Sequence, residues 1–121
     1  MGLRDLKKRL TASVRELDDQ RLQDRFHGLD ITAMADLQCR LPVRVGGEIT
    51  RMRTMPRSGV AAVEVTVSDG TGSAVAVFTG RRQLGGVEHN RAIVLEGVAH
   101  DEHGKRVLLN PAYTLLPTAH D

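Results

Sequence analysis

"VEVTVSDGTGSAVAVF", residues 63 to 78, joins two valine-rich runs through four small turn residues. In each run valine alternates with smaller or polar residues, which is the period-two pattern of a β-strand. The sequence "DGTG" between the runs supplies the aspartate and the glycines that tight turns require. The stretch therefore predicts a β-hairpin, and it ends on one of only three aromatic rings in the chain.

The register of this hairpin depends on the length of its turn. We expect Asp69 to cap a type I turn and Gly72 to take the left-handed position of a bulge, with residues 70 to 72 as the loop. Val67 then faces Val75, and the valines of both strands gather on one face, which becomes the core. Phe78 falls on the other face and is predicted to point outward, where its ring either forms a binding platform or packs under the connector or the N-terminal helix.

The rest of the chain after residue 42 has the same texture, with β-branched residues alternating with polar ones between turn sequences. Five short strands with a longer gap after the third favour a small barrel, because closure removes exposed sheet edges. Pro42 marks the start of this domain, which covers residues 42–117 and leaves 118–121 as a tail. The predicted strands are residues 43–54, 61–68, 73–80, 91–100 and 106–115.

The N-terminal part, residues 1–41, is predicted to be an amphipathic helix and a connector. Leucines and one valine recur at three- and four-residue steps, which indicates a helix over residues 2–24. Residues 27–42 form the connector, with one helical turn over 32–38. The apolar face of the first helix either packs on the barrel or binds a protein partner or a second copy of the chain.

Composition limits the possible classes of protein. A chain of 121 residues has room for one compact domain. It holds no apolar run of the roughly 20 residues that a membrane helix needs, and its first residues lack the apolar core of a secretory signal. The single cysteine, Cys39, excludes an internal disulfide, so we expect a cytoplasmic protein. A net charge of +2 permits polyanion binding without requiring it.

The order of several short motifs resembles a known fold family. Asp69 with Gly72 in the hairpin turn, Gly97 in the fourth strand, and Asn110 with Pro111 near the last strand resemble the OB-fold of RecG-type helicase wedge domains and of class II tRNA synthetase anticodon-binding domains. The whole chain looks like a small stand-alone OB-fold protein family common in actinobacteria. The resemblance implies an all-β, five-stranded Greek-key barrel after an N-terminal helix. It also implies nucleic-acid binding and no catalysis.

OB-folds of this kind bind ligands on the outer face of strands two and three, bordered by the loops between strands one and two and between strands four and five. The basic residues near that face would neutralise phosphates, while Phe78 would stack on one base. Tyr113 either adds a second ring or packs in the barrel, because both faces of its strand are apolar. The resemblance therefore implies a nucleic-acid-binding site formed by Arg51, Arg53, Arg57, Phe78, Arg81, Arg82, Lys105, Arg106 and Tyr113.

Two of these arginines raise a question of register. Arg51 and Arg53 share strand parity with Val45 and Ile49, which are core candidates. Either the first strand extends past the barrel rim, or a bulge at residues 46–47 changes its register.

The sequence favours binding over chemistry. His100 and His103 flank two acidic residues, but no cysteine or third histidine lies near them, so we expect no metal and no cofactor. No nucleophile has a recognisable catalytic setting, and we predict no enzymatic activity. The predicted function is low-specificity binding of DNA or RNA, at a single strand or a junction. The alternative is a protein interaction or oligomerisation module without nucleic-acid binding.

Overall fold

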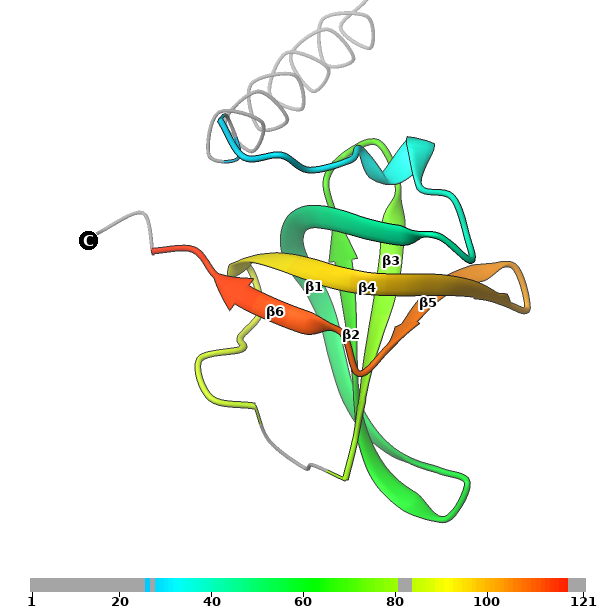
Figure 1. Cartoon of the computed structure of the whole chain (residues 1–121). Helices are drawn as coiled ribbons and strands as arrows, with labels where there is room; N and C mark the ends of the chain where they lie inside the picture. The colour runs from blue at the N-terminus through cyan, green and yellow to red at the C-terminus, as the bar shows by residue number, and fades with distance from the viewer. Residues whose placement is uncertain (1–25, 27, 81–83, 118–121) are drawn as a thin grey trace, which may run out of the picture.

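The computed structural model describes residues 26, 28–80 and 84–117 of the chain (Figure 1). The helix predicted over residues 2–24 lies outside this part, and so does any self-association through it. Arg81, Arg82 and the tail over residues 118–121 also lie outside the described residues.

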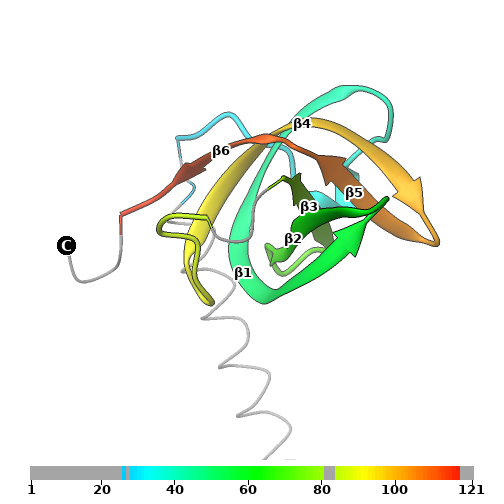
Figure 2. The ribbon, with the colours of Figure 1, turned by 90° about the horizontal axis from the view of Figure 1, so that it is seen from below.

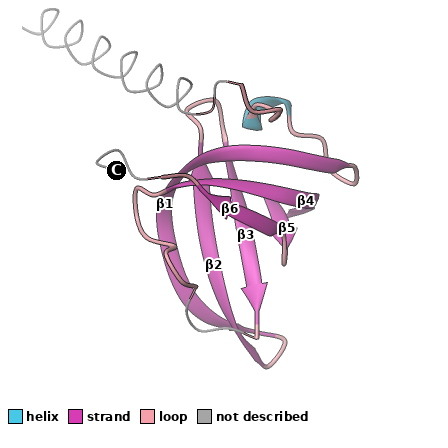
Figure 3. Ribbon diagram, turned by 60° about the vertical axis from the view of Figure 1, so that its left-hand side comes forward, coloured by secondary structure: helices cyan, strands magenta, loops and turns pink. Residues whose placement is uncertain are grey.

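The described part of the chain forms six β-strands and one short 3-10 helix (Figure 3). All five predicted strands are present within a few residues of their expected bounds, and the helical turn predicted over residues 32–38 is present as η1. The elements are η1 (Met34–Asp36), β1 (Pro42–Arg57), β2 (Val60–Ser68), β3 (Ser73–Thr79), β4 (Ala92–Glu102), β5 (Lys105–Leu109) and β6 (Ala112–Leu115).

The last predicted strand is divided in two, which corrects the expected strand number. Asn110 has a left-handed φ of 50°, and Pro111 has no N–H to donate to a sheet ladder, so pairing stops between β5 and β6. The Asn110 side chain instead forms hydrogen bonds to Thr79 of β3. Its Oδ1 accepts a hydrogen bond from the Thr79 backbone N–H at 2.9 Å, and its Nδ2 donates to Thr79 Oγ1 at 3.0 Å.

The strands form a ring in the order β1-β2-β3-β5-β4, and β4 pairs back with β1 to close it (Figure 2). Neighbours in the ring are antiparallel except β3 and β5, which are parallel. β6 pairs with the first half of β4. The closure is uneven, because the parallel seam joins only residues 75–77 to 107–109, whereas β1 and β2 form a long hairpin that extends beyond the barrel.

The β2–β3 hairpin differs from the prediction in its register. Ser68 pairs with Ser73 and Val63 pairs with Phe78, so residues 69–72 form the turn. A slip of one residue moves every side chain of β3 to the opposite face. Phe78 is therefore only 4% exposed and lies in the core, and the prediction that its ring points outward is wrong.

Packing in a small barrel explains this register. Ala74 and Ala76 lie beside Phe78 in the core and leave room for its ring, whose burial contributes about 1.5–3 kcal/mol. Val75 and Val77 lie on the outer face, yet both are buried together with Val107 of β5. Valines and alanines occupy opposite faces of β3, but this pattern does not identify the core face, because both faces are buried.

A β-bulge in β1 sets the direction of two arginines. Ile49 and Arg51 pair with successive residues of β2, so Thr50 is the extra residue. Ile49 stays in the core, while Arg51 and Arg53 are exposed on the outside of the barrel. Both alternatives left open for β1 are thus observed, since the strand extends beyond the barrel and a bulge changes its register, but the bulge is at Thr50 rather than at residues 46–47.

One end of the barrel is closed by η1. The Met34 side chain is fully buried in the core. Asp69 Oδ2 accepts a hydrogen bond from the Met34 N–H at 2.8 Å, and Thr71 Oγ1 accepts one from the Ala35 N–H at 3.1 Å. Arg106 donates a hydrogen bond to the Met34 carbonyl. The turn of residues 69–72 and the start of β5 thus hold η1 from both sides.

Two adjacent glycines in β1 allow close approach by other parts of the chain. A Cβ at Gly46 would lie 2.6 Å from Cε1 of Phe26, a ring that packs with Ala92 and other apolar residues outside the main core. A Cβ at Gly47 would lie 2.4 Å from the Ser68 carbonyl oxygen. The second clash is the more serious, since a backbone group in a sheet cannot turn away as a side chain can.

We expect Gly47→Ala to lower the free energy of unfolding by about 1–3 kcal/mol, the usual cost of overpacking. Gly46→Ala should cost less because the Phe26 ring can move. Gly85→Ala is the matched control: nothing lies within 4 Å of its new Cβ, so the change should stay below about 0.5 kcal/mol. Urea unfolding followed by circular dichroism measures all three, and equal stability of the Gly47 and Gly85 variants would contradict this packing.

Candidate functional site

A groove of about 730 Å³ lies on the outside of the barrel. Its lining residues lie on β1, β2 and β3 and in the β4–β5 hairpin, while η1 and the turn of residues 69–72 border it at one end. Figure 1 shows where these elements lie in the barrel. We call it the outer groove. Its lining residues are Ala35, Thr50, Arg51, Thr66, Thr71, Gly72, Ser73, Ala74, Val75, Gly104, Lys105 and Arg106.

The lining of the outer groove is cationic and rich in hydroxyl groups. Arg51 and Lys105 are exposed, and neither forms an ion pair with another described residue. Arg106 is half-buried and holds η1 through the Met34 carbonyl. The described residues of the lining include no carboxylate and no aromatic ring. Such a surface suits an anionic ligand with many hydrogen-bond acceptors.

A second, smaller pocket of about 170 Å³ continues from the outer groove, with which it shares Val75 and Lys105. We call it the side pocket. Arg53 and Glu64 lie directly across from each other on β1 and β2 and form an ion pair at 3.3 Å. The other lining residues are Val77, Glu102, His103 and Val107, of which the two valines are buried.

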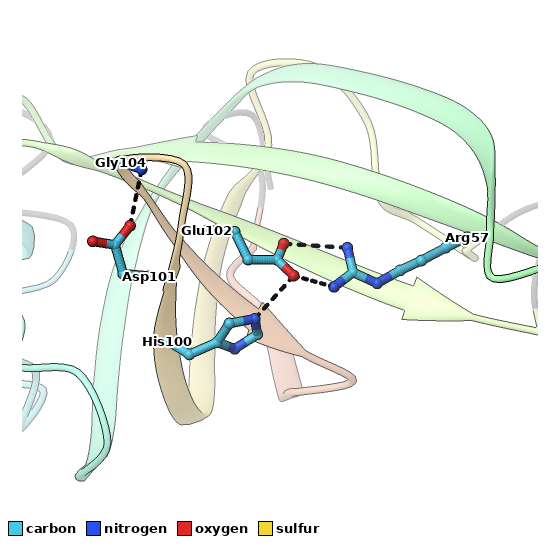
Figure 4. Close-up of polar contacts among 5 residues, drawn as sticks. All are labelled: Arg57, His100, Asp101, Glu102 and Gly104. Atoms are coloured by element: carbon cyan, nitrogen blue, oxygen red, sulfur yellow. Dashed lines mark hydrogen bonds and ion pairs between the residues drawn. The ribbon is translucent and has the colours of Figure 1, made fainter.

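An ion pair joins the ends of two hairpins across this face. Arg57, the last residue of β1, donates from Nη1 to Glu102 Oε2 at 3.2 Å and from Nη2 to Glu102 Oε1 (Figure 4). His100 Nε2 lies 3.2 Å from Glu102 Oε1, so this carboxylate contacts both side chains. The hydrogen bond from Arg57, and next that from His100, lowers the pKa of Glu102 to about 2. The same hydrogen bond raises the pKa of Arg57.

The structure brings together five of the nine residues that the sequence suggested. Arg51, Lys105 and Arg106 line the outer groove, Arg53 lines the side pocket, and Arg57 pairs with Glu102 nearby.

The two aromatic rings do not belong to this site. Phe78 is buried in the core, and Tyr113 packs against it edge-on, with ring centroids 5.4 Å apart and an angle of 79° between the planes. Tyr113 is half-buried, so of the two alternatives left open for it, packing in the barrel is the observed one. Neither ring offers a free face at the outer groove.

Sequence reasoning missed the hydroxyl groups of Thr50, Thr66 and Ser73 in the groove, and it missed Glu102 as a partner of Arg57. The threonine at the outer position of β2 could have been found once the register was known. The contact between Arg57 and Glu102 could not, because the two residues are 45 positions apart and meet only after the barrel has closed.

Within the described ranges, no three His, Cys, Asp or Glu side chains gather in a way that could hold a metal ion. No helix of the described residues is long and apolar enough to cross a membrane.

The lowered pKa of Glu102 predicts a specific dependence of stability on pH. The group has an ordinary pKa of 4.5 and a value of about 2 in the folded protein, so its ion pair stabilises the fold fully above 4.5 and loses this effect as the pH falls through about 2. Because solvent screens this partly exposed pair, we expect Glu102→Gln to unfold at a slightly lower temperature than wild type at neutral pH and at the same temperature near pH 2. Thermal scans at several pH values test this, and a stability difference that is constant over the whole range would contradict it.

Comparison with known proteins identifies the fold. No family model matches the chain, and a search of curated proteins finds no match. Among solved structures, the OB domain of a Thermoplasma acidophilum protein has a TM-score of 0.53 and 13% identity, covering 75% of this chain and 96% of that one. At these identities the similarity concerns the fold alone.

Two further structures were solved with DNA. RecG bound to a three-way DNA junction has a TM-score of 0.55 and 16% identity over 74% of this chain, and the match spans 13% of the RecG chain. A chain in the structure of a replication protein A heterotrimer bound to single-stranded DNA has a TM-score of 0.50 and 12% identity. The match covers 78% of this chain and 71% of the replication protein A chain. With its strand order β1-β2-β3-β5-β4-β1 and these neighbours, the described part of the chain has an OB fold.

Proposed function

We propose that this protein is a cytoplasmic OB-fold protein, of a family common in actinobacteria, that binds DNA or RNA through phosphate contacts with little sequence readout. Its ligand is a single strand or a junction, and it performs no catalysis. The outer groove is the binding site, with Arg51 and Lys105 as the phosphate-binding cations.

One observation carries this proposal: the outer groove combines two cations that lack an ion-pair partner among the described residues with several hydroxyl groups and no carboxylate in its described lining. The net charge of the whole chain is only +2, so the location of the cations matters more than their number. Cations that converge on a concave surface raise the local concentration of a polyanion. Neutralising phosphates releases counterions, which drives binding to nucleic acid.

The lining of the groove also indicates what the protein does not use. Stacking of a base on an aromatic ring contributes about 1–3 kcal/mol per base in single-strand binders. Phe78 and Tyr113 pack against each other in the barrel and are not available for stacking there. Threonine and serine hydroxyl groups can instead donate hydrogen bonds to phosphate oxygens. Recognition of the sugar-phosphate backbone is thus the mode that fits this surface.

The solved neighbours support the ligand class. RecG and replication protein A, both similar to this chain in fold, were solved in complex with a DNA junction and with single-stranded DNA. This similarity concerns the fold, so the inference about the ligand of this chain depends on the outer groove itself.

We expect the wild-type protein to bind a fluorescent oligothymidylate at low salt, with an affinity that falls by a log–log slope of about −0.7 for each phosphate engaged. Arg51→Gln should weaken binding several-fold and make the slope shallower by about 0.7. Arg44→Gln is the control, because Arg44 lies on the same strand but pairs with Glu96 at 3.5 Å and does not line the groove. Absence of wild-type binding at low salt to the oligothymidylate, to an RNA strand of the same length and to a DNA junction would overturn the proposed function. Equal losses in the two variants would misplace the site.

We also expect an abasic sugar-phosphate chain to bind almost as tightly as an oligothymidylate of the same length, because phosphates supply most of the affinity. If bases were stacked on the protein, each missing base would cost about 1–3 kcal/mol. Competition of the two chains for the labelled oligothymidylate measures the difference. A large preference for the chain that carries bases would contradict backbone recognition.

A further inference from the structure

The ion pair between Arg57 and Glu102 has a geometry that also suits a phosphate group. Both Nη atoms of Arg57 bond to the two oxygens of the carboxylate, and His100 contacts one of these oxygens from another direction (Figure 4). The planar fork of arginine binds carboxylate and phosphate in the same two-point manner. The carboxylate of Glu102 thus lies where a phosphate oxygen pair would receive the same donors.

The location of this pair is equally informative. Arg57 ends β1 beside the β1–β2 turn, and Glu102 ends β4 beside the β4–β5 turn, so the pair joins the two hairpins that border the outer face. Glu102 also lines the side pocket, which continues into the outer groove through Lys105. A strand held by Arg51 and Lys105 would therefore pass close to Arg57.

The pair is open to exchange. The side chains of Arg57 and Glu102 are each 33% exposed, and that of His100 is 41% exposed. Solvent screens ion pairs with this degree of exposure, so the net stability of this pair is modest even with its two-point geometry. A ligand that carries many phosphates can replace one carboxylate without exposing a buried charge.

We propose that Arg57 and His100 form a phosphate subsite that Glu102 occupies in the free protein and that a phosphate of the bound strand takes over. The proposal rests on the proposed function, because it assumes that a nucleic acid lies along the outer groove. Glu102 acts as an internal competitor that lowers affinity and is displaced when the strand binds.

The test compares binding of the fluorescent oligothymidylate to the full-length wild-type protein, Glu102→Gln, and Glu96→Gln. Removing the competitor should tighten binding by about threefold, which matches the small cost of breaking a partly exposed ion pair. Glu96→Gln is the matched control: it makes the same charge change on the same strand and also breaks an ion pair with an arginine, Arg44. It lines neither the outer groove nor the side pocket, and its effect should be smaller.

A second pair of variants separates displacement from simple repulsion. If Glu102 acts by occupying Arg57, its removal should matter little once Arg57 is gone. Adding Glu102→Gln to the Arg57→Gln variant should then raise the affinity for the oligothymidylate by no more than Glu96→Gln does in wild type. If Glu102 only repels phosphates by its charge, the gain should be the same with and without Arg57, and this result would overturn the subsite. Circular dichroism of each variant confirms that the fold is retained.

The outcomes keep the two proposals apart. Binding by wild type with no tightening in Glu102→Gln overturns the subsite and leaves the proposed function intact. Tighter binding by Glu102→Gln that disappears when Arg57→Gln is also present supports the subsite. Failure of every variant to bind the oligothymidylate, an RNA strand of the same length or a DNA junction at low salt overturns the proposed function and the subsite with it.

Discussion

The carboxylate of Asp69 is the interaction on which most of this structure depends. Its Oδ1 accepts hydrogen bonds from the Thr71 N–H at 2.9 Å, the Thr71 hydroxyl at 2.6 Å and the Gly72 N–H at 3.2 Å, while its Oδ2 accepts one from the Met34 N–H. The first three bonds shape the turn and thereby set the register of β2 against β3. The fourth fixes η1 over the barrel end and forms one border of the outer groove. A single side chain thus links the core to the candidate site.

Most of the fold follows from the sequence, and the failures have a common cause. Strand positions were predictable because alternation and turn residues are local signals. The register of β3 was not, since the choice between Phe78 and the valines depends on how much volume the closed barrel can hold. A bulge in β1 was one of the alternatives from the sequence, but its position at Thr50 was not predicted. Nothing in the local sequence distinguishes Thr50 from its neighbours. Packing across the whole ring decides such questions.

The candidate site illustrates the same division. The approach of Arg51, Lys105 and Arg106 to one groove follows from strand order and could be predicted from the fold. Their individual roles could not. Arg106 holds η1, and Arg53 and Arg57 form ion pairs with Glu64 and Glu102. The number of arginines therefore overstates the positive charge that is available to a ligand. In the described part of the structure only a few cations in the outer groove are available.

The most direct test of this account is to map the contact surface in solution. Amide and side-chain NMR shifts of the labelled protein, recorded while oligothymidylate is added at low salt, show which residues meet the strand. We expect changes concentrated at Arg51, Thr66, Ser73 and Lys105, with Phe78 nearly unaffected. Changes centred on Phe26 and the opposite side of β4, or none at all, would contradict it.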